Sequence, residues 1–403
     1  MPSTDASARG VTPGSSSSPF APSALDVVRA LNAHTRRLGL PGPAALIGDW
    51  ADVDAVIAPS IELVAGCAPP ANPDRFWFGA LSFPVRVDES PLPEVVGGLV
   101  DGVLLLSDGE WLWRSVTGAP QPDWVRQARQ TVAHSEPWQT DWATPSRDAH
   151  LDAVEHCLDA IRAGEVYQAC VCTQFRGQLT GNALDFFADI AATTAPAKSA
   201  WLSGEWGSIA SFSPESFLNR RGTHVTSSPI KGTVPAATDP AVLSASSKDI
   251  AENVMIVDLV RNDLGRVARI GSVTVPDLLT VVGAPGVWHL VSTVAAELNA
   301  DVGHDALLDA TFPPASVTGT PKIRAMELLA DWEGDARGVY CGAIGVAGPD
   351  GLLDLNVAIR TVAITPSNDL TLGVGGGITI DSSPSAEWQE CLDKAASIVD
   401  FSA

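Results

Sequence analysis

The sequence predicts an α+β fold built on antiparallel β-sheets. Strand-like segments follow one another in runs and are joined by short turns, several of them with Asp-Gly or other glycine pairs. A few amphipathic helices interrupt these runs. Strands and helices do not alternate regularly, as they would in a doubly wound parallel sheet. We therefore expect antiparallel sheets with strands that neighbour each other along the chain.

Two elements follow directly from local patterns. Asp108 and Gly109 separate two apolar arms in the segment VLLLSDGEWLWR, which is the pattern of a β-hairpin. Further along, leucine, valine and isoleucine recur at helical spacing between Ser146 and Gly164. Serine is a good N-cap and glycine a common stop, so we expect one helix between these two residues.

Strand signals dominate the rest of the chain. WLSGEWGSIASFSPESFL and LNRRGTHVTSSPI predict consecutive antiparallel strands. The segment 339–380 predicts a three-stranded meander, with turns at Asp350-Gly351 and around Asn368. Helices are expected at about 247–264, 321–331 and 385–399.

Composition divides the chain into three parts. Residues 1–22 are rich in serine and proline, and we expect them to form a disordered polar tail. Residues 23–140 carry short apolar runs broken by turns, which predicts an N-terminal β-rich subdomain. Residues 141–403 contain the segments with chemical potential discussed below, and we expect them to form the catalytic domain.

The charge excludes several classes of partner. With 47 acidic and 25 basic residues, the formal net charge is −22, which opposes binding to nucleic acid and to anionic membrane surfaces. No apolar run approaches the ~20 residues that a membrane-spanning helix needs. The six cysteines show no C-x-x-C spacing. We therefore expect free thiols and a cytoplasmic protein.

Two helices each carry a pair of acids at i,i+3 spacing, which puts both carboxylates of a pair on one helix face. The first pair is Asp249 and Glu252, and the second is Glu387 and Glu390. If the helices converge, their carboxylates can hold Mg²⁺. The alternative is a solvated acidic face, which is the commoner role of such residues in an acidic protein.

Two segments suggest anion binding. In GVGGGITID, glycines follow a strand and precede the second acidic helix, so a turn there would expose several backbone N–H groups. In ASVTGTPKI, Thr320 fits an N-cap and Pro321 a first helical position, which places Thr318 beside the positive end of a helix. A tight loop and ordinary capping explain the same residues.

Lys231 stands in the segment PIKGTVP, between an apolar residue and a glycine. A lysine in such a tight setting near buried strands can act as a nucleophile when its charged form is disfavoured. The alternative is a solvated lysine, which is the common case.

Taken together, these segments resemble the chorismate-utilising enzymes, which include anthranilate, aminodeoxychorismate, isochorismate and salicylate synthases. The resemblance covers about residues 147–400, and its motifs occur in the order AGEVYQ, SFSPESF, PIKGT, SKDIAENVMIVDLVRNDLGRV, VWHLVSTV, FPPASVTGTPKIRAMELL, DLNVAIRTV and GVGGGITIDSSPSAEWQECLDKA. It implies two antiparallel sheets packed as a sandwich, with helices outside and chorismate between the sheets.

The resemblance also implies a site. It assigns Mg²⁺ to Glu252, Glu387 and Glu390, with Asp249 as a nearby acid, and it places His289 near the C4 hydroxyl that departs. The positions that would contact chorismate are Gln168, Thr318, Tyr340, Arg360, Gly375, Gly376 and Lys394.

Two positions discriminate among the activities of the family. Isochorismate and salicylate synthases carry a water-activating lysine where this chain has Gln168. Anthranilate synthases usually have alanine where it has Lys231, whereas the aminodeoxychorismate enzymes have lysine. The resemblance thus implies that Lys231 attacks C2 of chorismate and that ammonia then attacks C4. Glu215 matches the acid that manages protons beside this lysine.

The resemblance further implies that ammonia comes from a separate glutamine amidotransferase subunit. The product would be 4-amino-4-deoxychorismate, which leads to p-aminobenzoate and folate. Three alternatives remain: amination at C2, as in anthranilate or 2-amino-2-deoxyisochorismate synthases; a catalytically silent chorismate-binding protein; and a carbohydrate-binding sandwich, suggested by 12 tryptophans.

Overall fold

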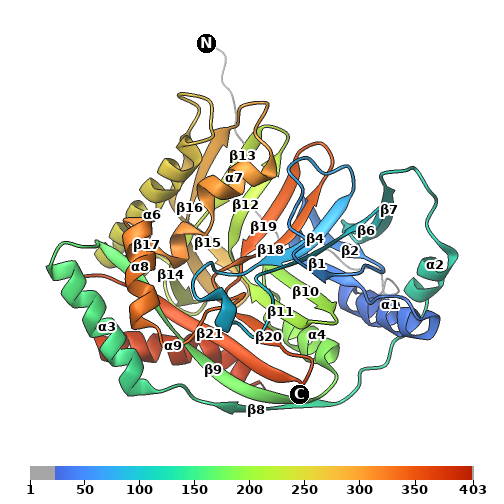
Figure 1. Ribbon diagram of the computed structural model, residues 1–403, viewed down its shortest axis with the longest axis horizontal. Helices are drawn as coiled ribbons and strands as arrows, with labels where there is room; N and C mark the ends of the chain where they lie inside the picture. The colour runs from blue at the N-terminus through green and yellow to red at the C-terminus, as the bar shows by residue number, and fades with distance from the viewer. Residues whose placement is uncertain (1–22, 402–403) are drawn as a thin grey trace.

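The computed structural model describes residues 23–401, whose strands form two large sheets that pack against each other (Figure 1). The tail expected at residues 1–22 lies outside the described residues. Strand ladders within both sheets are antiparallel. The predicted α+β class is therefore confirmed.

We call the larger sheet sheet A. Its path consists of β17 (Gly319–Thr320), β9 (Gln168–Gly181), β21 (Asp369–Ile378), β20 (Thr361–Ile364), β11 (Gly207–Ser213), β10 (Lys198–Gly204), β1 (Ala44–Trp50), β2 (Val53–Ala58), β6 (Gly102–Ser107) and β7 (Glu110–Ser115), and β8 (Trp138–Ala143) pairs with β9 off this path.

We call the second sheet sheet B. Its path consists of β14 (Ile230–Pro235), β16 (Val287–Glu297), β13 (His224–Ser228), β12 (Ser216–Arg221), β19 (Leu352–Val357), β18 (Ala343–Gly348), β4 (Phe76–Leu81), β5 (Val95–Val100) and β3 (Val64–Ala65), and β15 (Thr274–Ala284) pairs with β16 off this path.

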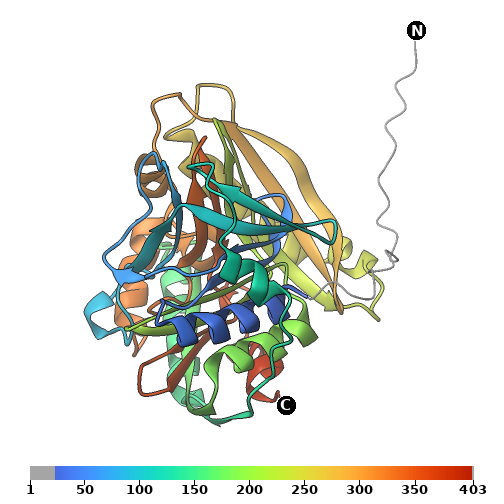
Figure 2. The same cartoon turned by 90° about the vertical axis from the view of Figure 1, so that its right-hand side faces the viewer.

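Helices cover the outside of this sandwich. Sheet A is covered by α1 (Ala24–Leu38), α3 (Arg147–Arg162), α4 (Ala183–Thr194) and α9 (Pro384–Val399), and α1 and α4 lie side by side in Figure 2. On the β14–β16 end of sheet B lies α6 (Ser247–Gly265). The remaining helices are α2 (Asp123–Arg129), α5 (Ala241–Ala245), α7 (His304–Thr311) and α8 (Lys322–Trp332). Among the described residues, no helix is long and apolar enough to cross a membrane.

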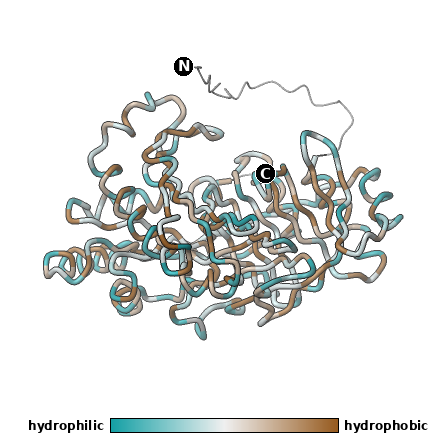
Figure 3. The backbone as a smooth tube through the Cα atoms, turned by 90° about the horizontal axis from the view of Figure 1, so that it is seen from above, coloured by the Kyte–Doolittle hydropathy of each residue, from teal (hydrophilic) through white to brown (hydrophobic). Residues whose placement is uncertain are grey.

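The hydrophobic core follows the alternation of the strands. Along β1, Leu46 belongs to the core between the sheets, whereas its neighbour Ala45 packs under the helices of sheet A. Phe78 and Ile344 of sheet B complete the core between the sheets. Hydrophobic residues therefore mark both faces of many strands, as the brown stretches of the tube in Figure 3 show. Such double-sided burial is what a sheet covered on both faces requires.

The N-terminal strands extend both sheets (Figure 1). In sheet A, β1 pairs with β10, and in sheet B, β4 pairs with β18. The strands of residues 23–140 are thus hydrogen-bonded to strands of residues 141–403. The division into a subdomain and a catalytic domain at this boundary stays a prediction.

Most of the local predictions are confirmed. Asp108 and Gly109 connect β6 and β7 as a hairpin, and α3 begins after Ser146, whose side chain accepts a hydrogen bond from the backbone N–H of Ala149. The three further helices are α6, α8 and α9.

The predicted C-terminal meander is wrong. The segment forms four strands in two sheets: β18 and β19 pair in sheet B, and β20 and β21 pair in sheet A. The chain crosses between the sheets at residues 358–360, where Arg360 has a positive φ of 49°. Such a backbone conformation is rare outside glycine, so the sequence pattern gave no sign of the crossing.

The predicted cap of α8 is also wrong. The N-cap is Pro321, without a side-chain hydrogen bond, and the helix begins at Lys322. Thr320 instead belongs to the short strand β17, where it pairs with Gln168. Because Thr320 is paired in this strand, the chain stays extended there, and the helix begins one residue later than predicted.

Candidate active site

Two neighbouring crossings between the sheets position Glu215 and Arg360. The first crossing leads from β11 to β12 and contains Glu215, and the second leads from β19 to β20 and contains Arg360. Backbone hydrogen bonds fix both: Val357 N donates to Glu215 O at 3.0 Å, and Phe212 N donates to Arg360 O at 2.9 Å. The fold thus brings an acid and a cation to the seam between the sheets.

The glycines of GVGGGITID lie within β21 and do not form a turn, so the predicted loop is wrong. Gly375 is paired with Cys172 and Gly377 with Cys170 of β9. The space beside these glycines is occupied by other groups: a Cβ at Gly373 or Gly375 would clash, whereas one at Gly377 would only touch its neighbours. A Cβ at Gly377 would lie 3.4 Å from Lys231 Nζ, 3.5 Å from Gln168 Oε1 and 3.6 Å from Glu252 Oε2.

The neighbouring Gly376 faces the second acid pair. A Cβ there would lie 2.9 Å from Glu387 Oε2 and 3.6 Å from Glu390 Oε1. Together, Gly376 and Gly377 show that the acidic helices α6 and α9 converge on one short piece of β21. The structure therefore brings together Lys231, Gln168 and the three predicted metal ligands.

Beside these glycines, one edge of β21 has no partner strand among the described residues. On the side away from β9, β20 pairs only with Leu370–Leu372. Gly375 O accepts a hydrogen bond from Lys394 Nζ at 2.7 Å, so this residue turns its backbone polar groups away from β9. In an antiparallel pair, N–H and C=O of one residue point to the same side. The N–H of Gly375 is thus directed to the open edge, where it can bind an anion.

Lys231 lies at the beginning of β14, where its ammonium donates a hydrogen bond to Ser316 O at 3.2 Å. Glu215 lies nearby and is 4% exposed, with no hydrogen-bond partner for Oε1 among the described residues. Burial raises the pKa of Glu215, and Ser316 and Lys231 oppose this rise. A buried carboxyl of this kind can exchange a proton with a neighbouring amine.

Lysines balance the acidic cluster. Lys394 Nζ lies 2.7 Å from Glu390 Oε1, and Lys248 Nζ lies 3.3 Å from Glu387 Oε1 and 3.8 Å from Glu252 Oε1. Burial raises the pKa of Glu252, against the effect of Lys231 and Lys248. For Glu390, burial acts in the same direction, but the charge and hydrogen bond of Lys394 outweigh it and lower the pKa.

Lys248 belongs to this cluster, although no sequence motif singled it out. It precedes Glu252 by four residues on α6, so the two side chains share a helix face. That spacing was visible in the segment SKDIAE. Its contact with Glu387 of α9 depends on the packing of two distant helices and had no sequence signal.

The acidic residues fit Mg²⁺ chemically. Carboxylate oxygens are its preferred protein ligands, and Mg²⁺ usually keeps several waters and substrate oxygens beside one or two carboxylates. Glu252 Oε1 is buried and has no hydrogen-bond partner among the described residues. Within residues 23–401, no three His, Cys, Asp or Glu side chains form a ready-made metal cluster. An ion held partly by substrate and water does not require one.

His289 and Asp249 contact the two residues that follow Lys231 on β14, Thr233 and Gly232. His289 lies on β16, and its Nδ1 is 2.8 Å from Thr233 Oγ1. Burial, with a smaller contribution from the positive charge of Arg360, lowers the pKa of His289 to about 4, so the imidazole is neutral at neutral pH. Asp249 packs on the backbone: a Cβ at Gly232 would lie 3.1 Å from its Cγ.

Arg360 is partly buried and has no ion pair or side-chain hydrogen bond within residues 23–401. Burial lowers its pKa. A half-buried arginine without a partner is suited to binding a carboxylate through two parallel hydrogen bonds, as a bidentate pair.

Tyr340 and Thr318 are held by other contacts. A Cβ at Gly373 would lie 2.2 Å from the ring of Tyr340, which is buried against that glycine. The hydroxyl of Thr318 donates to Ala315 O at 3.1 Å, within its own turn. Their roles as substrate contacts stay predictions.

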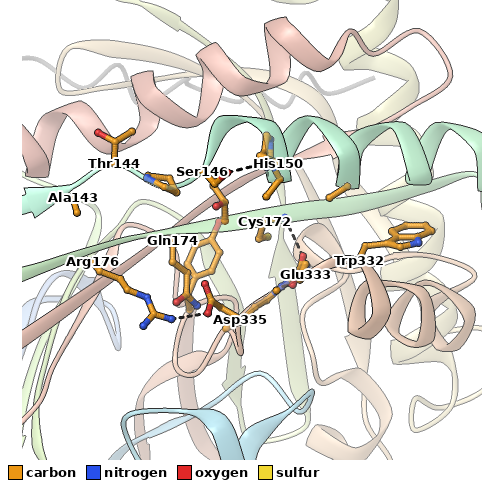
Figure 4. Close-up of a pocket in the computed structure, with 17 residues that line it drawn as sticks. Ala143, Thr144, Ser146, His150, Cys172, Gln174, Arg176, Trp332, Glu333 and Asp335 are labelled. Carbon is orange, nitrogen blue, oxygen red and sulfur yellow. Dashed lines mark hydrogen bonds and ion pairs between the residues drawn. The ribbon is translucent and has the colours of Figure 1, made fainter.

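A cavity of about 280 Å³ opens at the edge of β9 (Figure 4). Along this edge β17 pairs with residues 168–169 and β8 with residues 176–181, which leaves the stretch between them without a partner strand. Side chains bind that stretch instead, since Cys172 N donates to Glu333 Oε1 at 2.9 Å. His150, Cys172 and Glu333 line the cavity in Figure 4, but Lys231 and the predicted metal ligands do not. It is therefore distinct from the acidic cluster.

Comparison with known proteins identifies the family. The family model described as chorismate binding enzyme matches residues 105–400. The chain belongs to the chorismate binding enzyme family. Within this family, it is 36% identical over 329 residues to aminodeoxychorismate synthase component 1 of Klebsiella aerogenes, which covers 78% of this chain and 72% of that protein.

Other members of the chorismate binding enzyme family are similar as well. Anthranilate synthase component 1 of Haloarcula marismortui is 37% identical over 275 residues, covering 65% of this chain and 56% of that protein. The crystal structure of anthranilate synthase component I from Streptococcus pneumoniae matches with a TM-score of 0.69 and 23% identity, covering 89% of this chain and 90% of that one. This structural match confirms the predicted fold.

Proposed function

We propose that this chain aminates chorismate at C4, as the first component of an aminodeoxychorismate synthase. The observation that carries the proposal is the position of Lys231. Its amine lies beside the buried Glu215 and faces Gln168 and Glu252 across Gly377. The relative from Klebsiella aerogenes bears this enzyme's name and matches most of the chain.

Chorismate carries two carboxylates, and the site offers two kinds of partner for them. Arg360, which directly precedes β20, and the N–H of Gly375 at the free edge of β21 are suited to one carboxylate. Glu252, Glu387 and Glu390 would hold Mg²⁺, which supplies positive charge to the other carboxylate when it is bound. An acidic protein can bind a dianion in this way.

The chain's own residues would carry out two displacements. Lys231 Nζ would attack C2 of chorismate, both ring double bonds would shift along the ring, and the C4 hydroxyl would leave with its bonding electrons. Ammonia would then attack C4, both double bonds would return, and the amine of Lys231 would leave C2. Glu215 would take the proton from Nζ and return it. Neutral His289 would hydrogen-bond the C4 hydroxyl.

Gln168 supports amination over hydration. Its side chain lies next to Lys231 and Glu252 at Gly377, and its Oε1 has no hydrogen-bond partner among the described residues. An amide is a poor base, so it does not activate water. The free oxygen can instead accept a hydrogen bond from ammonia or from the substrate.

The ammonia would come from a separate glutamine amidotransferase subunit. The relatives named component 1 imply a second component. The product, 4-amino-4-deoxychorismate, would then lead to p-aminobenzoate and folate.

A second candidate is amination at C2, which would make the chain an anthranilate synthase component. The 37% identity to the Haloarcula marismortui protein favours this reading. Lys231 argues against amination at C2, because ammonia can attack C2 only if the lysine does not bind that carbon itself.

One experiment decides between the two. The purified chain is incubated with chorismate, Mg²⁺ and ammonium, and the product is identified by mass and fluorescence. We expect 4-amino-4-deoxychorismate. Anthranilate as the product, or free p-aminobenzoate without an added lyase, would overturn the assignment.

A further inference from the structure

Lys248 occupies the space between the two acidic helices. It projects from α6, and its ammonium lies 3.3 Å from Glu387 Oε1 on α9 and 3.8 Å from Glu252 Oε1 on its own helix. Glu387 is 2% and Glu252 7% exposed, whereas the Lys248 side chain is 43% exposed. A half-exposed cation thus reaches in between two buried carboxylates.

This contact is more than an ordinary helix-surface pair. Lysine preceding glutamate by four residues is the less favourable order on a helix. The Glu252 oxygen that faces Lys248, Oε1, is buried and has no hydrogen-bond partner in the described part of the chain, because 3.8 Å is too long for a hydrogen bond to the ammonium. Two buried acids that share one cation, one of them without a hydrogen bond to it, have the capacity to bind a more highly charged cation in its place.

The surrounding charges point the same way. Lys231, Lys248 and Lys394 lie near Glu252, Glu387 and Glu390 and offset much of their negative charge, although Asp249 and the buried Glu215 are further acids nearby. Mg²⁺ alone would add two positive charges to a cluster whose lysines already neutralise much of its charge. Mg²⁺ together with a substrate dianion adds none.

We propose that Lys248 is the resident counter-ion of the metal position in the ligand-free enzyme, so that a divalent cation must displace its ammonium to bind. This inference rests on the proposed metal site. Lys248 therefore lowers the affinity for metal in the absence of chorismate. Its length and exposure allow it to swing into solvent when the metal and the substrate dianion arrive together.

The test measures metal binding directly, without turnover. Mn²⁺ prefers the same oxygen ligands as Mg²⁺, and its free form is quantified by electron paramagnetic resonance. We expect Lys248→Met to tighten Mn²⁺ binding to the substrate-free enzyme by about fivefold or more, because the competing charge is gone. Lys248→Arg, which keeps the charge, should stay close to the wild type.

Arg261→Met is the matched control. Arg261 lies on the same helix, its side chain is 51% exposed, and it pairs with Asp258. Its removal changes the net charge by the same amount and should leave Mn²⁺ binding unchanged. A tightening of equal size in Arg261→Met and Lys248→Met would overturn the inference, because it would reflect net charge alone.

Glu387→Gln separates this inference from the proposed metal site. If Glu387→Gln abolishes Mn²⁺ binding while Lys248→Met binds like the wild type, the metal site stands and the role of Lys248 is refuted. If Glu387→Gln has no effect on Mn²⁺ binding, with or without chorismate, the proposed metal site itself is refuted. Thermal unfolding of each variant verifies that the half-exposed position tolerates the change.

Discussion

Lys231 and Glu252 both approach Gly377, a residue without a side chain on β21. A Cβ at Gly377 would lie 3.4 Å from the amine of Lys231 and 3.6 Å from Glu252 Oε2. The proposed nucleophile and a proposed metal ligand thus share one surface, although 21 positions separate them along the chain. Because that surface is a strand backbone without side chains, both groups can reach a flat ring lying on it.

Gly376→Ala should weaken the use of metal. The new methyl group would lie 2.9 Å from Glu387 Oε2, so this carboxylate must move. We expect the Mg²⁺ concentration for half-maximal activity to rise several-fold, with little change in thermal stability, since only the end of a flexible side chain is in the way. Gly373→Ala is the contrasting variant: its methyl would lie 2.2 Å from the Tyr340 ring, and the unfolding temperature should fall. An unchanged Mg²⁺ requirement in Gly376→Ala would contradict the proposed position of the metal.

The rate of C4 amination by the Lys231→Ala variant should fall by roughly two orders of magnitude or more, because the two-step route requires the nucleophile. The folded state loses the hydrogen bond from the ammonium to Ser316 O, worth about 1.5–3 kcal/mol for a charged donor, and the attraction of Lys231 to Glu215 and Glu252. Product formation with ammonium and thermal unfolding, measured on the same preparation, separate the two effects. Near-normal turnover in a folded Lys231→Ala variant would exclude the covalent route.

Glu387→Gln and Arg360→Ala should fail in different ways. Glu387 is a proposed metal ligand, so its amide variant should raise the Mg²⁺ needed for half-maximal activity. Arg360 faces no acidic partner in residues 23–401, so its loss should mainly raise KM for chorismate. Titrations of Mg²⁺ at saturating chorismate, and the reverse, measure both. If the Mg²⁺ titration of Glu387→Gln matches the wild type, the metal lies elsewhere.

The sequence predicted the parts of this fold that depend on local pattern. The α3 cap at Ser146 and the hairpin at Asp108-Gly109 are confirmed because neighbouring residues determine them. The crossing at Arg360 was missed because the pattern of residues 339–380 predicted one continuous three-stranded meander. Which sheet a strand joins depends on partners far along the chain, and no local period reports it.

The candidate site shows the same limit. The i,i+3 spacing of Glu387 and Glu390 correctly places both carboxylates beside Gly376. Reading the glycines as a turn was wrong, because composition does not tell a loop from a strand whose side-chain space is occupied by Tyr340 and Glu387. The contact of Lys248 with Glu387 joins residues 139 positions apart and had no local signal.

The His304→Gln variant should lose less of its free energy of unfolding than the wild type as the pH falls. His304 is fully buried, and burial, together with Arg220 beside its Nδ1 at 3.3 Å, lowers its pKa to about 4. In the unfolded chain its pKa returns to about 6.5, so the unfolded state binds the proton first. Its contribution to stability is thus complete above pH 6.5 and is lost as the pH falls toward 4.

The stability of His304→Gln relative to the wild type should therefore rise by about 1–3 kcal/mol between pH 6.5 and 4.5. Urea unfolding across this range measures the difference. His156→Gln, a substitution of an exposed histidine on α3, is the control. A difference between His304→Gln and the wild type that is constant with pH would show that His304 is not held neutral.

Glutamine should not support amination by this chain alone. Amidotransferase chemistry needs a cysteine thiolate activated by a neighbouring histidine. Among the described residues, Cys391 is the cysteine within hydrogen-bonding distance of a histidine, with its Sγ 3.6 Å from His150 Nε2. The two residues join α9 to α3 and are both buried.

This pair is unsuited to that chemistry. Burial raises the pKa of Cys391 to about 12 and lowers that of His150 to about 4, so proton transfer from thiol to imidazole is strongly unfavourable. We expect the purified chain to be active with ammonium at alkaline pH, where free NH₃ is available, and inactive with glutamine. Adding the glutaminase subunit from the same organism should restore glutamine-dependent turnover. The Cys391→Ala variant tests the remaining route: if the chain alone uses glutamine and this variant does not, the buried pair is the missing glutaminase, and the separate subunit is unnecessary.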